Sequence, residues 1–451
     1  MSNNKEINTD FLQEISELIL ENSKKIIQEK ISDLHVADIG ELIKNLSIEQ
    51  AHYLFQLLDE EKSALVLMEV EEEVREQLLS NLSSKEIATE VIENLESDDA
   101  TDLISELPHE KKEEVLSLIE DDEHASDITD LLSYPEDTAG GLMAKELIKV
   151  NENWNTLQCL KEMRKQASEV KKVHTIYVVN NKEELVGTLS LRRLLLTESK
   201  IAIKEISNSE IISVPVTEDD ESVANIMNKY DLIVIPVVDE NKKLVGRITI
   251  DDVMDVVKEE SEKDYQMASG ITEDVESSDS IWQLTRARLP WLLIGLFGGI
   301  LGAEIIGLFE DFSKFTKLAF FIPLIAAMGG NVGVQSAAIV VQGLANNSIK
   351  INTILGKLTK ELGVALLNGI ICSIIIFAAT LILQYSIQLS ITVSLSLLSV
   401  IVFAALFGTF IPLTLEKYKI DPALATGPFI TTVNDILGLY IYFLIGQAIL
   451  S

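Results

Sequence analysis

The chain has 451 residues, and its 71 acidic and 37 basic side chains give a formal net charge of −34 at pH 7. The charge is uneven, because residues 1–280 hold 64 of the acidic and 28 of the basic side chains, whereas residues 281–451 hold seven and nine. Nucleic acid and anionic lipid both need a basic surface, so neither is expected to bind the first region. We predict an acidic soluble region followed by a hydrophobic membrane region.

The sequence also argues against secretion and catalysis. Cys159 and Cys372 have no spacing partner, so no disulfide framework or zinc site is predicted. The first residues do not combine a basic and an apolar stretch, so we expect no cleaved signal peptide and a cytosolic soluble region. No nucleophile–base set or catalytic metal cluster is apparent, so we do not expect an enzyme.

Residues 1–135 have a helical pattern throughout. Leucine and isoleucine recur at spacings of three and four residues, as in "ADIGELIKNLSIEQAHYLFQLL". Ser47-x-x-Gln50 and Ser83-x-x-Glu86 fit the capping box found at helix N-termini. Short, similar helices of this kind can stack into a superhelix, so we predict an all-α superhelical N domain.

An internal repeat follows the helical region. The stretch "IYVVNNKEELVGTLSLRRLL" (176–195) aligns with "IPVVDENKKLVGRITIDDVM" (235–254) at a constant offset of 59 residues. Each copy reads as strand, polar turn, strand and helix. This pattern resembles a tandem pair of α/β CBS domains, which we place at residues 136–257. Such pairs are usually regulatory and many bind adenine nucleotides, so ATP is a candidate ligand although the chain has no P-loop.

A connecting helix is assigned to residues 258–280, between the CBS pair and the membrane region. It belongs to a charged, helix-compatible stretch that begins near residue 250. Asp252, Asp255 and Glu259 share one face of that stretch at helical spacing. Like charges on one face destabilise a helix unless a cation neutralises them, and a solvated linker helix is the alternative.

Five apolar stretches after residue 280 are each long enough to span about 30 Å of hydrocarbon. They cover residues 288–309, 318–342, 362–384, 392–415 and 422–450. Seven basic residues flank the side that also holds residues 1–280, namely Arg286, Arg288, Lys350, Lys357, Lys360, Lys417 and Lys419. Only Lys314 and Lys317 flank the other side. The positive-inside rule then predicts a multi-pass plasma-membrane protein with a cytosolic N-terminus and an external C-terminus.

Close helix packing is predicted for the first span. It contains Gly295-x-x-x-Gly299 and Gly298-x-x-x-Gly302, small-residue patterns that let membrane helices approach one another.

The second span, with "IPLIAAMGGNVGVQSAA", and the fifth, with "GPFITTVNDILG", contain proline as well as glycine. We expect these residues to break both helices and to free backbone carbonyls that point into a polar path.

Asp435 lies inside the fifth span, where an ionisable group costs at least ~2.5–3.5 kcal/mol unless it faces protein or water. We assign it to a cation pore, with a protonated or paired structural carboxylate as the alternative. Asn331 and Gln335 of the second span either face the same path or form hydrogen bonds between helices. Oxygen ligands suit a hard divalent cation such as Mg²⁺, and a two-fold dimer would supply two Asp435 carboxylates to one ion.

Over nearly its whole length the chain resembles the MgtE family of magnesium channels and transporters. The order of its parts matches that family, and so do the motifs "EDTAGGLM", "MGGNVGVQSA" and "DPALATGPFITTVNDILG". The resemblance implies a homodimeric, Mg²⁺-selective pore centred on Asp435, with regulatory Mg²⁺ sites among the N domain, the CBS pair and the connecting helix. It places a five-helix transmembrane domain at residues 281–451.

The residues to which the family pattern points form two sets. The pore set is Asp435, Asn331, Gln335, Thr431, Thr432 and Gly427. The metal-binding set is Asp98, Asp102, Asp219, Glu221, Asp231, Asp252, Asp255, Glu260, Asp264, Asp421 and Asp435. Two positions depart from the pattern, because Lys263 replaces an expected acidic residue and Gly427 stands where a pore-lining Asn can occur.

The acidity of residues 1–280 leads to a gating hypothesis. At low Mg²⁺ the acidic faces repel one another and the pore opens, whereas at high Mg²⁺ bound ions bridge the carboxylates and hold it closed. One alternative is a cation-coupled secondary transporter of divalent metals such as Co²⁺ or Mn²⁺. Another is a membrane sensor that transports nothing.

Overall fold

A computed structural model describes residues 9–167, 170–273, 275, 279–309, 317–345, 354–425 and 427–450. Lys314 and Lys350, which the orientation argument uses, lie outside these ranges, as does part of the predicted connecting helix. The chain divides into two compact units, residues 1–257 and residues 258–451, and each is described by itself.

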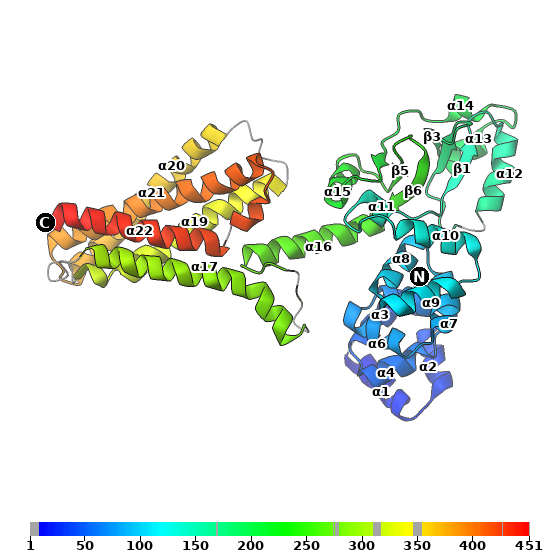
Figure 1. Cartoon of the computed structure of the whole chain (residues 1–451), viewed down its shortest axis with the longest axis horizontal. Coiled ribbons are helices and arrows are strands. Elements are labelled where there is room, and N and C mark those ends of the chain that lie inside the picture. The colour runs from blue at the N-terminus through cyan, green and yellow to red at the C-terminus, as the bar shows by residue number, and fades with distance from the viewer. Residues whose placement is uncertain are drawn as a thin grey trace. The chain divides into compact units, whose positions relative to one another are not determined.

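Helices α1 to α10 form the first part of the N-terminal unit (Figure 1). They are α1 (Thr9–Leu20), α2 (Lys24–Ile31), α3 (Val36–Lys44), α4 (Ile48–Phe55), α5 (Glu60–Met68), α6 (Glu72–Ser80), α7 (Ser84–Glu86), α8 (Ser97–Glu106), α9 (His109–Leu118) and α10 (Asp122–Leu131). A π-helical turn (Ile87–Val91) and a 3₁₀ turn (Ile92–Asn94) precede α8. The apolar faces of these helices share one hydrophobic core. Ser47 and Ser83 form both predicted capping boxes, which are therefore confirmed.

Two three-stranded sheets follow, and the second repeats the first. One contains β1 (Ile148–Asn151), β2 (Ile176–Val179) and β3 (Leu185–Leu189), and the other β4 (Val214–Pro215), β5 (Val234–Val238) and β6 (Leu244–Thr249). In both sheets the first two strands pair parallel and the last two antiparallel. Val178 pairs with Gly187 and Val237 with Gly246, and the register shifts at the next residue in both copies. The predicted tandem CBS repeat is confirmed.

The helices around these sheets are short, apart from the last. They are α11 (Ala139–Leu142), α12 (Thr156–Gln166), α13 (Leu191–Leu196), α14 (Ile203–Ile206), α15 (Asp220–Lys229) and α16 (Ile250–Ala268). Because α16 starts directly after β6, the first part of the predicted connecting segment is helical. The boundaries assigned to the domains remain a prediction.

The second unit contains five helices long and apolar enough to cross a membrane, counted among its described residues. They are α17 (Ile281–Leu308), a span from Lys317 that includes α19 (Ile322–Ala345), α20 (Ile354–Ile382), α21 (Ile387–Lys417) and α22 (Gly427–Leu450). A 3₁₀ turn (Pro422–Ala425) precedes α22. The helices run alongside one another as a bundle (Figure 1). The five predicted spans, and with them the predicted fold class, are confirmed.

The expectation that proline and glycine break the second and fifth spans is wrong. Both α19 and α22 are continuous α-helices through their glycine-containing motifs. Pro323 and Pro428 each occupy the second position of their helix, within the first turn, where backbone N–H groups have no partner in the helix and a proline is tolerated. The glycines instead allow neighbouring helices to approach, as is common in membranes.

Gly333 marks the closest approach of three helices. A Cβ built on Gly333 would lie 1.9 Å from Nδ2 of Asn434 on α22, and one built on Gly408 of α21 would lie 2.3 Å from the Gly333 carbonyl oxygen. Gly298 on α17 packs closely against Thr432 of α22, and a Cβ built on Gly298 would lie 2.0 Å from Cγ2 of Thr432. Gly295 has no atom within 4 Å of its Cβ position. Of the two glycine patterns in the first span, only the second therefore packs against another described helix.

We expect Gly333→Ala to destabilise the membrane unit by about 1–3 kcal/mol, because the added methyl group must displace the Asn434 amide. Gly295→Ala is the matched control, since its methyl group enters open space. Thermal unfolding of the detergent-solubilised protein should show a lower Tm for Gly333→Ala alone. Equal Tm values for the two variants would contradict this account of the packing.

Candidate ion sites

Asp435 lies in the middle third of α22, about 12 Å along the axis from Gly427. Its neighbour Asn434 is buried, and Asn434 Nδ2 donates a hydrogen bond of 3.3 Å to the Gly329 carbonyl oxygen of α19. The Asp435 side chain is half-buried. Within the part of the chain that the structure describes, no basic side chain pairs with it. An ionised Asp435 therefore needs a cation or water from outside these residues.

Four other predicted pore residues lie on α19 and α22. Asn331 and Gln335 are one turn apart on α19, and both are exposed on the isolated chain. Thr431 and Thr432 are half-buried on α22, and Thr431 Oγ1 donates a 3.0 Å hydrogen bond to the Pro428 carbonyl oxygen. An exposed amide is costly in lipid, so Asn331 and Gln335 need a polar environment that the described residues of one chain do not supply.

Asp98 is the most enclosed of the predicted cytosolic metal ligands. It lies in the first turn of α8 and is only 8% exposed. Burial raises the pKa of Asp98 well above its usual range, and the nearby carboxylates of Asp252 and Asp99 raise it further. The pKa of Asp99 is raised to about 6, first by burial and then by Asp252. The structure thus brings Asp98 close to Asp252 of α16, as the family pattern implies.

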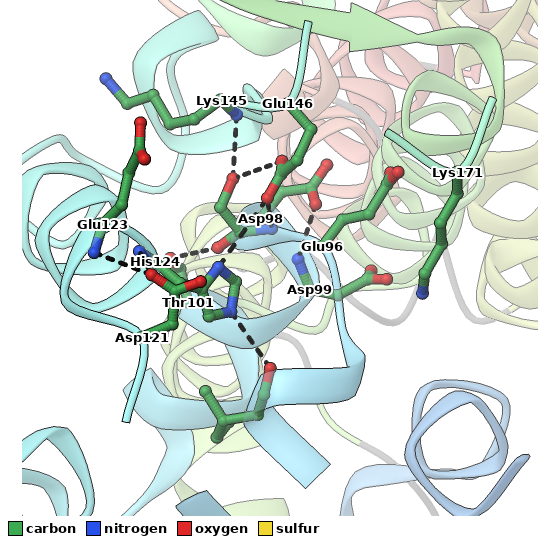
Figure 2. Close-up of polar contacts among 12 residues, drawn as sticks. Glu96, Asp98, Asp99, Thr101, Asp121, Glu123, His124, Lys145, Glu146 and Lys171 are labelled. Carbon is green, nitrogen blue, oxygen red and sulfur yellow. Dashed lines mark hydrogen bonds and ion pairs between the residues drawn. The ribbon is translucent and has the colours of Figure 1, made fainter. Parts of the chain in front are cut away.

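Polar contacts from the CBS pair enclose the start of α8 (Figure 2). The Glu146 carboxylate accepts hydrogen bonds from the Ser97 amide (2.9 Å) and from Ser97 Oγ (2.8 Å). It also lies 3.9 Å from Nδ1 of His124 on α10. Arg247 on β6 forms a 2.9 Å ion pair with Glu96, which directly precedes α8. These contacts fix the helix end that carries Asp98.

The other predicted ligands of the N-terminal unit differ in their surroundings. Asp102 lies one turn from Asp98 on α8, and burial together with the Asp99 carboxylate raises its pKa to about 7. Asp219, Glu221, Asp231 and Asp255 are exposed. Asp219 has a local role, because its carboxylate caps α15 by accepting a hydrogen bond from the Ser222 amide. Their assignment as metal ligands therefore remains a prediction.

The second unit holds another acidic group, formed near the end of α16 and just before the 3₁₀ turn that precedes α22. Burial raises the pKa of Asp264 on α16, and the carboxylates of Asp421 and Glu260 add to this effect. Lys263 forms a 2.8 Å ion pair with Glu260. Lys263, which stands where an acidic residue was expected, thus partly neutralises the predicted ligand Glu260.

These groups have the donor chemistry of a Mg²⁺ site but not a closed coordination shell. In the described residues no three His, Cys, Asp or Glu side chains are arranged to hold a metal ion directly. Mg²⁺ usually keeps several waters and binds through one or two carboxylates, which matches the Asp98–Asp252 and Asp264–Asp421 groupings. The residues present therefore fit a hydrated ion.

Sequence reasoning missed the residues that hold α8 in place. Glu96, Glu146 and Arg247 are far apart in the chain, so no local spacing links them. One signal was available, because Arg247 lies in a strand of apolar pattern where the first repeat has Thr188. A charged residue in a buried strand requires a partner.

Sequence reasoning also missed a contact in the second unit, where Ser336 Oγ of α19 donates a 2.6 Å hydrogen bond to the Glu361 carboxylate of α20.

Stacked helices, a CBS pair and five apolar helices define a polytopic membrane protein with a cytosolic regulatory region. The family model described as the MgtE intracellular N domain matches residues 34–137, and the CBS domain model matches residues 139–199 and 203–259. The MgtE model, described as a divalent cation transporter, matches residues 322–445.

Whole-chain relatives agree with this division. The chain is 33% identical to the magnesium transporter MgtE of Bacillus subtilis, over 93% of this chain and 92% of the relative. It is 31% identical to the Thermus thermophilus magnesium transporter MgtE, over 97% of this chain and 98% of the relative. The chain belongs to the MgtE family.

A solved structure described as the cytosolic domain of the Mg²⁺ channel MgtE in complex with ATP is 32% identical, with a TM-score of 0.51. The match covers 54% of this chain and 99% of the solved structure. The soluble part of a magnesium transporter is 28% identical, with a TM-score of 0.50 over 55% of this chain and 98% of that structure.

We expect Asp98→Asn to stabilise the full-length protein in EDTA, raising its Tm by about 2–4 °C. The variant removes a buried charge that neighbouring carboxylates disfavour, and Asn Oδ1 can still accept the 2.9 Å bond from the Asp99 amide. The increase in Tm on adding Mg²⁺ should be smaller in Asp98→Asn than in wild type. Asp33→Asn, at an exposed position, is the control and should change neither value. An unchanged Mg²⁺ effect in Asp98→Asn would contradict this electrostatic explanation.

Proposed function

We propose that this protein is a Mg²⁺-selective channel that takes up magnesium across the cell membrane through a path lined by α19 and α22. The observation that carries the proposal is Asp435, a carboxylate in the middle of an apolar helix with no described basic partner. Its helix belongs to the segment matched by the divalent cation transporter model. The names of the relatives supply Mg²⁺ as the transported ion.

The functional assembly is proposed to be a homodimer. Asn331 and Gln335 are exposed polar residues on a membrane helix, and a second copy across a water-filled path would give them a polar setting. Two Asp435 carboxylates would then supply two negative charges to one divalent ion. In the N-terminal unit, Ile233 and Met254 are large exposed apolar residues close to the β6–α16 junction, as expected of a surface that another chain covers.

Closure at high Mg²⁺ is proposed to arise from the acidic groups outside the pore. Asp98 and Asp252 lie together while both are partly removed from water, and the half-buried Asp264 lies near Asp421 and Glu260. Hydrated Mg²⁺ at such groups would remove like-charge repulsion and hold the closed arrangement. Asp102 and Asp255 would join these sites from the next turns of α8 and α16, and the exposed carboxylates of Asp219, Glu221 and Asp231 would join from another element or from the second copy.

ATP is proposed as a ligand of the CBS pair. The support is the relative whose cytosolic domain was solved in complex with ATP and whose whole length this chain matches. The orientation proposed from the flanking basic residues places the C-terminus outside the cell.

Asp435→Asn should reduce Mg²⁺ flux into liposomes at least about tenfold, because the ion loses its charged ligand in a low-dielectric region. The control is Glu304→Gln, which also removes an acidic group from an apolar helix but at an exposed position of α17. Wild-type flux that depends only on the Mg²⁺ gradient and on voltage would indicate a channel. Flux that also requires the gradient of another ion would indicate a coupled transporter. Unchanged, still selective flux in Asp435→Asn would remove the basis of this proposal.

Combined neutralisation of Asp252, Asp255 and Asp264 to Asn should leave a pore that still conducts in millimolar Mg²⁺. Fewer carboxylates remain for the bridging ions, so the closed state loses its stabilisation. The matched control neutralises Asp33, Glu41 and Glu49, three exposed carboxylates on or near α3 and α4. Single-channel or liposome recordings that show normal closure in the first triple variant would reject the gating hypothesis.

A further inference from the structure

Helix α17 begins with a segment that its membrane span does not need. Residues 290–308 of this helix are about 28 Å long, which is enough to cross the hydrocarbon of a bilayer. Residues 281–289, which come before them, form the entry segment of α17. Arg286 and Arg288 make this segment too polar for the hydrocarbon, so it lies either along the membrane surface or in water.

One side of the entry segment is apolar and open. Ile281, Trp282 and Leu289 are 86%, 75% and 45% exposed. Their spacing places all three on one side of the helix, together with the exposed Thr285. Large apolar side chains gathered on one exposed side usually mark a contact with a partner or with a membrane.

Two arginines border this apolar side. At 3.6 residues per turn, Arg288 lies at one edge of it and Arg286 at the other. Arg286 forms a 3.1 Å ion pair with Glu273, but both side chains are exposed, so the pair is weak and a lipid phosphate can compete for the arginine. Arg288 forms no ion pair with a described residue. An apolar side edged by arginines and carrying a tryptophan is typical of a helix that lies among lipid headgroups.

The opposite side of the entry segment is held by the protein. Ala287 is fully buried, and its carbonyl oxygen accepts 3.0 Å hydrogen bonds from both the amide and the hydroxyl group of Thr272. Pro290 cannot donate a hydrogen bond to the Arg286 carbonyl oxygen, and α17 bends in its first third (Figure 1). The entry segment therefore turns away from the direction of the span while its apolar side stays open.

We propose that the entry segment is an interfacial anchor that lies on the cytosolic surface of the membrane and binds anionic lipid headgroups. Its apolar side faces the bilayer, and Arg286 and Arg288 contact lipid phosphates. Continuity supports a lipid occupant, because the same helix runs directly into the bilayer. Charge supports an anionic one, because the cytosolic leaflet attracts basic side chains next to a membrane helix. The anchor does not depend on which ion the protein carries.

Tryptophan fluorescence tests the anchor in the full-length protein. The chain has three tryptophans, so Trp154→Phe combined with Trp291→Phe leaves Trp282 as the reporter. This variant is placed in nanodiscs of phosphatidylcholine, with or without phosphatidylglycerol, that carry a nitroxide label near the headgroups. We expect the nitroxide to quench Trp282, and acrylamide in the water to quench it at least about twofold less when phosphatidylglycerol is present.

A second reporter covers the case in which the double tryptophan variant has a lower Tm than wild type. Ile281→Cys with a bimane label reports on the same apolar side in a chain that keeps its tryptophans. The unsubstituted chain, labelled in parallel, corrects for any label on Cys159 or Cys372. The nitroxide and acrylamide should act on the bimane as they do on Trp282.

Charge variants separate lipid recognition from packing. Arg286→Gln combined with Arg288→Gln should abolish the effect of phosphatidylglycerol and leave Tm unchanged, because both positions are exposed. Lys357→Gln combined with Lys360→Gln is the matched control. It removes two positive charges near the start of α20 and should match wild type in the reporter signal.

Three results would overturn the proposal. Equal access of acrylamide to the reporter in every lipid mixture would mean that the entry segment projects into water. A reporter that neither acrylamide nor the nitroxide quenches would mean that protein, such as a second copy of the chain, covers the apolar side. Nitroxide quenching that changes neither with phosphatidylglycerol nor in the double arginine variant would show a membrane contact that does not recognise anionic lipid.

Discussion

A carboxylate removed from water must find a positive charge or take up a proton, and this constraint governs both units of the protein. Asp98 is enclosed by protein and has Arg247 and several carboxylates nearby. Asp264 is near Asp421 and Glu260, with Lys263 as a partial counter-charge. Asp435 lies within the membrane helices with no described cation beside it. In the function proposed above, a mobile cation would complete each arrangement, and the same ion would act at the regulatory region and at the pore.

The local signals in the sequence were sufficient for the secondary structure and the domain order. Ser47 and Ser83 predicted helix starts because a capping box needs only residues within four positions of one another. The 59-residue repeat predicted two matching sheets, since each copy carries its own strand and turn pattern. The five spans followed from length and hydropathy alone.

What the sequence could not predict depends on contacts between distant segments. Nothing near Gly333 indicates that it meets Asn434, and so its motif suggested a broken helix when the glycine in fact accommodates a neighbouring helix. Likewise the sequence around Arg247 indicates only that a charged residue in an apolar strand needs a partner, and nothing local identifies Glu96 as that partner. The partner of each residue is set by the tertiary fold, which local spacing does not encode.

Gly427 has an implication for how this family can vary. Its φ is +48°, in the left-handed region, and a Cβ at this position would lie 2.4 Å from the Ala268 carbonyl oxygen at the end of α16. Most residues with a side chain would therefore be strained here and would also push α16 away from α22. Asn tolerates this φ better than most residues, but its Cβ would still meet the Ala268 carbonyl oxygen. Because the atoms in the way belong to the backbone, no side-chain change at residue 268 would make room, and the close approach of α16 to the start of α22 depends on glycine at residue 427.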